Sequence, residues 1–222
     1  MVSRSQKLYI CKVTKIKNII FDLGNVIIDL DIPRTRQEME RLMRHPDKMP
    51  AIFDEMEKAI HVYEVGDLSD ELFINTMIKH AHPHVYAQQV IRAWNAMLID
   101  IPLERLEFLN ELRNLGYKTF LLSNTNNIHL EWVNKYMLKN FNLPSLDSYF
   151  DRSYYSHLIR RRKPDISCFE YVLADAGIHA NESVFIDDLF HNIEGAKQAG
   201  LHTIYLTGGH DVISTLKSFL RI

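Results

Sequence analysis

The sequence predicts an α/β fold in which a doubly wound, mostly parallel sheet carries an inserted helical segment. Short apolar segments rich in strand-forming residues alternate along the chain with patterns of helical spacing. Strands that alternate with helices are typical of a parallel sheet with helices on both faces. One long stretch, from Pro33 to about Asp100, breaks the alternation because it has helical patterns and no convincing strand.

Four segments have the composition of buried parallel strands. Each is a short apolar run with β-branched or aromatic residues, and runs of this length and composition favour strands over helices. The predicted strands are Asn18–Asp22, Tyr117–Ser123, Ser183–Asp187 and His202–Thr207. The first strand is therefore separated in sequence from the rest of its sheet.

The segments between the later strands are predicted as helices. Leucines recur at helical spacing before Gly116, and glycines also follow two of the other patterns; glycine just after a periodic segment is a common helix stop. The predicted helices are a segment around Leu106, Leu109 and Leu112, then Asn126–Lys139, Asp165–Ala176 and Asn192–Ala199.

The long stretch without strands is predicted as an all-helical insertion. Apolar residues recur there at helical spacing, which indicates helices that bury one face. The patterns are Ile52/Met56/Ile60, Phe73/Met77 and Val90/Trp94/Met97. We therefore divide the chain into an α/β core, residues 1–32 and 101–222, and a helical insertion, residues 33–100.

Composition excludes several classes of protein. The 222 residues are 46% hydrophobic and carry a formal net charge of −2, so we expect a globular protein that binds neither nucleic acid nor membrane. No apolar run is long enough to span a bilayer. Two cysteines, Cys11 and Cys168, make no disulfide framework or metal motif, which favours a reducing cytoplasm.

Polar residues follow the first two predicted strands. Asp22 ends the first, and a turn that contains Gly24 comes next; such a carboxylate can attack phosphorus as a nucleophile, or it can simply cap a helix. Ser123 and Asn124 end the second strand, where a hydroxyl can bind a phosphate oxygen or cap the following helix. Parallel strands bring these residues to one edge of the sheet.

The later part of the chain adds a lysine and an acidic pair. Lys163 precedes a proline and a helix start, where a fixed ammonium can neutralise phosphoryl charge. Asp187 and Asp188 end another predicted strand. Adjacent buried carboxylates repel each other unless a cation relieves them. Mg²⁺ prefers one or two carboxylates with water and substrate phosphate, so Asp22 and Asp188 suit it.

These four pieces together resemble the haloacid dehalogenase superfamily, whose motifs run in the order aspartate, serine or threonine, lysine and acidic pair. The sequence around Asp22, Ser123, Lys163 and Asp187–Asn192 is most similar to the branch that contains sugar-phosphate phosphatases and the phosphatase domain of soluble epoxide hydrolase. The resemblance implies a Rossmann-like core and identifies the insertion with the helical cap of that branch.

The resemblance also implies a role for each residue. Asp22 would be the nucleophile, Ser123 would bind phosphate, and Lys163 would hold nucleophile and phosphate together, so that the catalytic set is Asp22, Ser123 and Lys163. The implied substrate contacts are Ser123, Asn124 and Lys163. The implied Mg²⁺ ligands are Asp22, the Gly24 carbonyl and Asp188, with Asp187 close by.

Two positions depart from the family pattern. Many phosphatases of the superfamily carry an acid–base aspartate two residues after the nucleophile, where this chain has Gly24. Glycine keeps the carbonyl that binds metal and loses the proton-transfer group, which contributes about 10²–10⁴-fold in rate. Arg160 stands where relatives often have glycine, and it either adds a substrate contact or does nothing.

The expected function is a Mg²⁺-dependent phosphatase that hydrolyses a small phosphorylated metabolite, with a sugar phosphate as one candidate, through an aspartyl-phosphate intermediate. Two alternatives remain open. A metal-free haloacid dehalogenase also lacks the second aspartate, although such enzymes generally lack the acidic pair that Asp187 and Asp188 form. A catalytically weak protein that only binds a phosphometabolite would explain Gly24, and the intact residues Asp22, Ser123 and Lys163 argue against it.

Overall fold

The computed structural model describes residues 15–45, 49–208 and 211–222, so Cys11 lies outside the described residues. A five-stranded sheet forms its centre, with the strand order β5-β4-β1-β6-β7 and every neighbouring pair parallel. The strands are β1 (Asn18–Phe21), β4 (Lys118–Ser123), β5 (Arg152–Tyr155), β6 (Ser183–Asp187) and β7 (His202–Tyr205). Four of these five correspond to the predicted strands.

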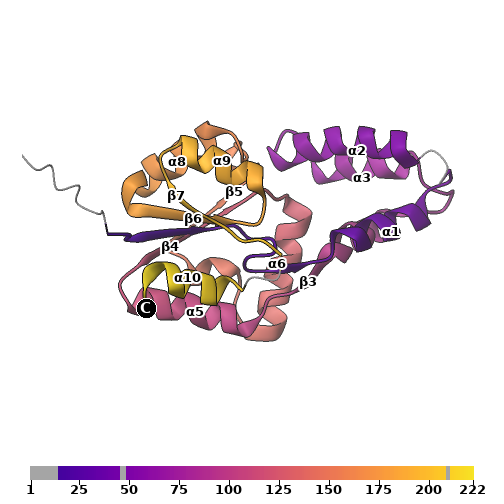
Figure 1. The fold of residues 1–222 in the computed structure, drawn as a ribbon. Helices are drawn as coiled ribbons and strands as arrows, with labels where there is room; N and C mark the ends of the chain where they lie inside the picture. Colours follow the sequence, from indigo (N-terminus) through magenta and orange to yellow (C-terminus); the bar gives the residue numbers. More distant parts are fainter. Residues whose placement is uncertain (1–14, 46–48, 209–210) are drawn as a thin grey trace, which may run out of the picture.

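Helices cover both faces of this sheet (Figure 1). Ile19 and Phe21 of β1 pack in one core with α5 (Leu103–Asn114), α6 (Asn127–Phe141) and α10 (Val212–Leu220). Ile20, between them, packs in the opposite core with α8 (Ile166–Ala176) and α9 (Phe190–Gln198). Because alternate strand residues face opposite sides of the sheet, both faces of the central strand β1 are buried. The predicted doubly wound α/β fold is confirmed.

The central position of β1 sets where its carboxyl end lies. Phe21 pairs with Leu121 of β4 on one side and with Ile186 of β6 on the other. The Asp22 backbone N–H continues the ladder by donating to the Ile186 carbonyl at 2.9 Å. Asp22 is therefore held between two neighbouring strand ends, at the topological position where open α/β sheets bind ligands.

Two strand features differ from the prediction. The edge strand β5 was not predicted, because Arg152–Tyr155 is polar at its start and short. A small antiparallel pair, β2 (Asp29–Leu30) with β3 (Leu98–Asp100), joins the two ends of the inserted segment. The strand β3 lies within residues 33–100, so that stretch is not wholly helical. Strands of two or three residues leave no periodic pattern in a sequence.

The inserted segment has helices and an apolar core of its own. Its helices are α1 (Ile32–Leu42), α2 (Met49–Glu64), α3 (Asp70–Ile78), α4 (Ala87–Trp94) and the short η2 (Asn95–Met97). Met39, Met56, Phe73 and Trp94 are among the buried residues that pack between them. Figure 1 shows α1, α2 and α3 beside one end of the sheet. The use of this segment as a separate domain stays a prediction.

The remaining short helical elements are η3 (Leu146–Tyr149), α7 (Ser156–Ile159) and η4 (Ala180–Glu182). Over the described ranges, every helix is too short or too polar to cross a bilayer. The cytoplasmic location stays a prediction.

Candidate active site

The candidate site lies at the carboxyl ends of the three central strands. Asp22 follows β1, Ser123 is the last residue of β4, and Asp187 is the last residue of β6. All three side chains are buried. The structure therefore brings together residues that are up to 165 positions apart, because parallel neighbours end at the same edge of a sheet.

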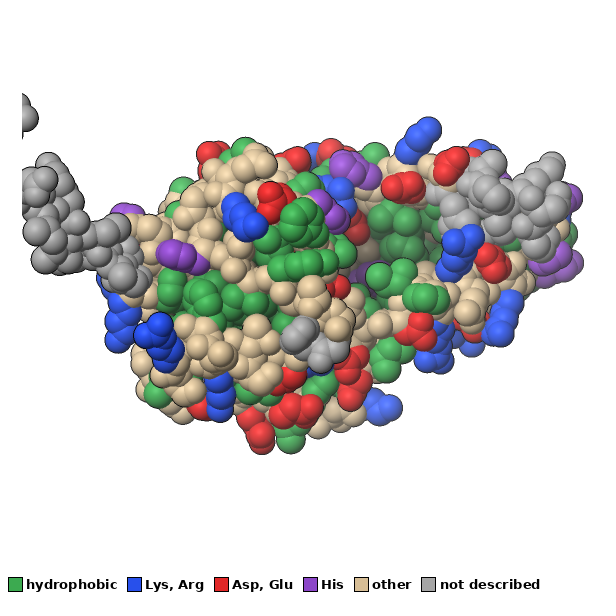
Figure 2. Space-filling view, viewed as in Figure 1, with side chains coloured by type: hydrophobic (Ala, Val, Ile, Leu, Met, Phe, Trp, Pro, Cys, Tyr) green, Lys and Arg blue, Asp and Glu red, His purple; other side chains and the backbone are tan. Residues whose placement is uncertain are grey.

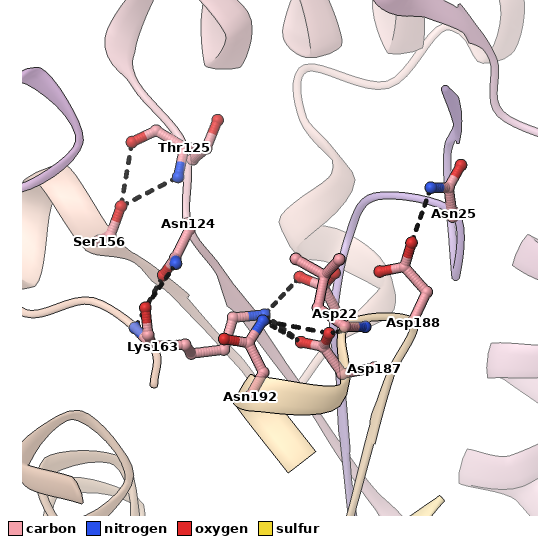
Figure 3. A network of polar contacts seen from close by, with 10 residues as sticks. Asp22, Asn25, Asn124, Thr125, Ser156, Lys163, Asp187, Asp188 and Asn192 are labelled. Carbon is pink, nitrogen blue, oxygen red and sulfur yellow. Dashed lines mark hydrogen bonds and ion pairs between the residues drawn. The ribbon is translucent and has the colours of Figure 1, made fainter. Parts of the chain in front are cut away.

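The ammonium group of Lys163 joins two of the carboxylates (Figure 3). Its Nζ donates to Asp22 Oδ1 at 2.5 Å and to Asp187 Oδ2 at 2.7 Å, and the lysine side chain is 1% exposed. Asn124 fixes the lysine backbone, donating to its carbonyl at 2.8 Å and accepting from its N–H at 2.9 Å. Asn124 is thus a positioning residue for Lys163, a task that its sequence context did not reveal, and its predicted contact with substrate stays a prediction.

A glycine on α9 allows the loop of Lys163 to come this close. A Cβ atom at Gly195 would lie 2.2 Å from the carbonyl oxygen of Pro164, the residue after Lys163. Any side chain at this position would push the loop away from the helix. The glycine therefore helps to hold the lysine over the strand ends.

Asp187 is fully engaged by hydrogen bonds from the chain. Its Oδ1 accepts from the Leu189 backbone N–H at 2.8 Å and from Asn192 Nδ2 at 3.1 Å. Its Oδ2 accepts from Lys163 Nζ and from Asn192 Nδ2, the latter at 3.0 Å. Since four short contacts occupy both oxygens, we assign Asp187 mainly to the frame of the site.

Asp188 has a more open environment. It is partly buried, and its Oδ2 accepts a single side-chain hydrogen bond in this site, from Asn25 Nδ2 at 2.7 Å. Asn25, which sequence reasoning did not single out, has a φ of 53°, a left-handed conformation that asparagine tolerates better than most residues. Figure 3 shows Asn25 reaching Asp188 from the loop after Asp22.

The three carboxylates form a cluster of the kind that binds a hard cation. One oxygen each from Asp22, Asp187 and Asp188 lies within 4.8 Å of the other two. Lys163 supplies one positive charge against their three negative charges. Oxygen ligands with an excess of negative charge fit Mg²⁺. The donor set therefore suits the predicted metal, while the predicted role of the Gly24 carbonyl stays a prediction.

Burial and mutual repulsion shape the titration of this cluster. Burial, against an opposing effect of Lys163 and with a smaller contribution from the charge of Asp187, raises the pKa of Asp22 to about 7. Burial also raises the pKa of Asp188, although the hydrogen bond from Asn25 acts to lower it. Burial alone would lower the pKa of Lys163, but Asp22 and Asp187 together raise it. Lys163 is therefore charged, and the raised pKa values of Asp22 and Asp188 indicate that one ammonium group does not offset the cost of burying their charges.

A cavity of about 410 Å³ adjoins these strand ends. Its lining includes Leu23 and Gly24 directly after Asp22, Ser123 at the end of β4, and residues from α1 and α2. Figure 2 shows hydrophobic side chains within a hollow beside the inserted helices. The cavity therefore lies between the core and the insertion.

Gly24 has a backbone that other residues can adopt. It is not among the glycines with positive φ, so nothing in its conformation requires glycine. A Cβ atom at this position would lie 2.6 Å from Leu30 Cδ1, the tip of a flexible side chain. The apolar Leu30 therefore occupies the space that a longer side chain at position 24 would need.

The basic run before Lys163 contacts the inserted helices. Arg160 forms an ion pair with Asp67, and Arg162 pairs with Glu64 of α2 at 2.8 Å. Arg162 also lies 2.9 Å from Nδ1 of His61 on the same helix. The sequence left the role of Arg160 open, and in the structure Arg160 contacts the insertion. This ion pair joins the core to the insertion next to the site.

Comparisons with known proteins find similar sequences over most of the chain. A family model for haloacid dehalogenase-like hydrolases matches residues 16–200. The D-ribitol-5-phosphate phosphatase of Bacteroides thetaiotaomicron is 29% identical over 203 residues, which cover 88% of this chain and 94% of that protein.

Solved structures extend the likeness to three dimensions. The crystal structure of a haloacid dehalogenase family enzyme from Bacteroides thetaiotaomicron matches with a TM-score of 0.84 and 30% identity, over 91% of this chain and 99% of that one. A wild-type complex of a family enzyme from this species with magnesium and inorganic phosphate matches with a TM-score of 0.74 and 32% identity, over 88% and 96%.

Proposed function

Because this chain belongs to the haloacid dehalogenase-like hydrolase family, we propose that it is a Mg²⁺-dependent phosphatase that forms an aspartyl-phosphate. The observation that carries the proposal is the buried contact of Lys163 with both Asp22 and Asp187 at the strand ends. The ammonium group positions the Asp22 carboxylate for attack on phosphorus, and its positive charge favours the binding of an anionic phosphate. The phosphatase activity of a relative supports the same reaction.

The residues of the chain account for the nucleophile and the binding of phosphate in both chemical steps, and solvent accounts for the protons. A carboxylate oxygen of Asp22 attacks phosphorus, and the bond from phosphorus to the ester oxygen breaks, with its electron pair leaving on that oxygen. The leaving alkoxide takes its proton from solvent water, because no acid stands at position 24. Water next attacks phosphorus and gives a proton to solvent, and the bond from phosphorus to Asp22 breaks, which releases inorganic phosphate and restores the Asp22 carboxylate. Lys163 fixes the attacking carboxylate through its 2.5 Å contact, and the buried Ser123 is placed to hold a phosphate oxygen.

The proposed metal site is built from Asp22, Asp188 and the Gly24 carbonyl. When bound, Mg²⁺ withdraws charge from the phosphate and offsets its repulsion by the acidic cluster. The crystal structure of a relative with magnesium and phosphate supports this cofactor. In this chain, Asn25 orients Asp188, whereas Asp187 keeps Lys163 and α9 in place.

The inserted helices are proposed to act as a cap over the site. Ion pairs from Arg160 and Arg162 join the insertion to the loop that carries Lys163. A cap that excludes water from the site would strengthen the electrostatic interactions within it. Residues 33–100 would then determine which small phosphorylated metabolites enter, and the name of the Bacteroides relative supports a sugar or polyol phosphate as one candidate.

Phosphate release from a panel of phosphate monoesters tests the proposal. With Mg²⁺, we expect turnover of at least one ester class, and with excess EDTA we expect turnover to disappear. Tight binding of phosphate esters without turnover would favour the binding-protein alternative. Metal-independent release of halide from haloacids would favour the dehalogenase.

The absence of an acid–base group at position 24 predicts a dependence on the leaving group. An aryl phenolate leaves without a proton, whereas an alkoxide needs one in the transition state. The wild type should therefore favour aryl phosphates. A double variant, Gly24→Asp with Leu30→Ala, provides both the carboxyl group and the space for it. We expect it to raise kcat for alkyl phosphates more than for aryl phosphates, by up to about 10²-fold.

The matched control is Gly24→Asn with Leu30→Ala, which has the same shape without the acid. Steady-state rates on both ester classes, with thermal unfolding as a folding check, give the comparison. Equal gains from the asparagine and aspartate variants would contradict a proton-transfer role. A wild type that hydrolyses alkyl and aryl phosphates equally fast would show that another group supplies the proton.

A further inference from the structure

The cavity beside Asp22 is the space that the organic part of an ester would occupy. Its lining begins with Leu23 and Gly24, directly after Asp22, and includes Ser123. A phosphate placed between Asp22 and Ser123 would border this cavity, which leaves room there for the substituent on its ester oxygen. Its volume of about 410 Å³ lies in the range of small-molecule sites. Since an apolar cavity of about 150 Å³ holds benzene, a substituted ring or a branched chain fits.

The walls away from the strand ends are mostly apolar. They combine residues of β2, α1, α2 and η2, and Met39 and Met56 among them are almost completely buried. The apolar residues of these elements that line the cavity include Leu30, Ile32, Met39, Met56, Ile60 and Met97. Side chains of this kind attract apolar groups by removing their surface from water.

One polar group in the wall, Thr35, is already satisfied within the protein. Its hydroxyl donates to the Trp94 carbonyl at 3.0 Å and accepts from the Met97 N–H at 2.8 Å. The single hydroxyl proton is therefore used. A substrate hydroxyl beside Thr35 would have to compete with two intramolecular hydrogen bonds.

His129 is similarly engaged. Its Nε2 lies 3.1 Å from the Trp94 carbonyl, which can only accept, so this nitrogen carries the proton. Its Nδ1 then accepts from Asn126 Nδ2 at 3.3 Å, and its ring stacks on Trp94 with centroids 4.9 Å apart. Burial lowers the pKa of His129 to about 4, so the ring offers no charge to a ligand at neutral pH.

The charged and amide side chains of the wall, Arg36, Glu64 and Asn124, also have partners, and Arg36 pairs with Glu40 at 3.1 Å. Glu64 pairs with Arg162 at 2.8 Å. Asn124 uses both ends of its amide on the backbone of Lys163. Polar groups that enter an enclosed site without partners lose their hydrogen bonds to water. Away from Ser123 and Thr125 at the strand end, the wall therefore disfavours the hydroxyl groups of a sugar and favours a hydrocarbon.

We infer that the substrate of this site is the monophosphate of an apolar alcohol or phenol, an inference that rests on the proposed phosphatase function. The phosphate lies at the strand ends, and the hydrocarbon part lies against Met39, Met56 and Ile60. This substrate class differs from the sugar phosphate that the sequence suggests.

A series of n-alkyl monophosphates tests the inference at constant leaving-group chemistry. Butyl, hexyl and octyl phosphate need the same protonation, so only the buried hydrocarbon changes. With Mg²⁺, we expect kcat/KM to rise roughly threefold to fourfold per added methylene until the cavity is full. Ribitol 5-phosphate, a polyol ester with a comparable leaving group, should fall below octyl phosphate by at least about 10²-fold.

Two variants place the effect in the cavity. Ile60→Gln puts an amide into the wall, and it should lower kcat/KM for octyl phosphate by about tenfold while butyl phosphate changes little. Ile99→Gln makes the same exchange at an exposed position of β3 that does not line the cavity, and it should keep the wild-type dependence on chain length. Thermal unfolding of both variants checks their folding.

The wild-type series is decisive without the variants. Turnover that is independent of chain length, or that favours the polyol phosphate, would overturn the inference and leave the phosphatase assignment standing. No turnover of any alkyl, polyol or aryl phosphate with Mg²⁺ would contradict the phosphatase assignment itself.

Discussion

Replacement of Asp22 by asparagine is expected to abolish phosphate release, with a fall in kcat of at least about 10³-fold. The variant keeps the size and shape of the side chain but removes the negative charge that attacks phosphorus. Lys163 retains Asp187 as a partner at 2.7 Å, so the frame of the site should persist. Steady-state rates on the best ester, with circular dichroism and thermal unfolding, measure both effects.

The control for this variant is Asp54→Asn, the same exchange at an exposed position of α2. It should leave kcat unchanged, since it removes a charge without touching the strand ends. If Asp22→Asn turned over esters at nearly the wild-type rate, Asp22 would not be the nucleophile. Loss of activity together with loss of folding would be visible in the unfolding curve, and the Asp22→Glu variant would then separate charge from position.

The second large effect is expected from the metal site. Excess EDTA should remove nearly all activity, and Mg²⁺ should restore it, because the acidic cluster otherwise repels an anionic phosphate. Asp188→Ala should raise the Mg²⁺ concentration for half-maximal activity more than Asn25→Ala, whose effect should be about 10–100-fold as for partners that only orient a ligand. Titrations of activity against Mg²⁺ give these values.

Asp187 provides the contrast within the acidic pair. Asp187→Ala leaves Lys163 and Asn192 without their shared carboxylate, and breaking such a buried pair costs about 3–5 kcal/mol. We therefore expect a large loss of thermal stability from Asp187→Ala and a small one from Asp188→Ala. Full activity in excess EDTA, or equal unfolding of the two variants, would contradict these separate roles.

The placement of the site could be predicted from sequence because it follows from strand ends. Asp22, Ser123 and Asp187 each end or follow an apolar run, and parallel strands bring such residues to one edge without further information. Lys163 was harder to place by pattern alone, since it stands in a loop. Its position depends on Asn124 and on the close approach of Gly195 to Pro164, which are contacts between distant segments.

The residues that line the cavity could not be predicted in this way. Met56 and Ile60 lie one helical turn apart on α2, and Met39 lies on α1. Apolar residues at such positions are equally typical of a buried core. These side chains line the same cavity as Leu23 and Gly24 because the insertion lies over the strand ends. The ion pair of Arg160 with Asp67 joins residues 93 positions apart, and neither residue has a local signal for it.

Chemical trapping of the phosphorylated carboxylate tests the central claim most directly. Gly24 provides no base for the attacking water, so the second step should be slow with an aryl phosphate and the aspartyl-phosphate should accumulate. Borohydride added during turnover reduces such a mixed anhydride to homoserine, which peptide mass spectrometry locates. We predict homoserine at position 22 when Mg²⁺ and substrate are both present and none when either is omitted. Rapid phosphate release with an unmodified Asp22, or with the modification on another carboxylate, would contradict the account.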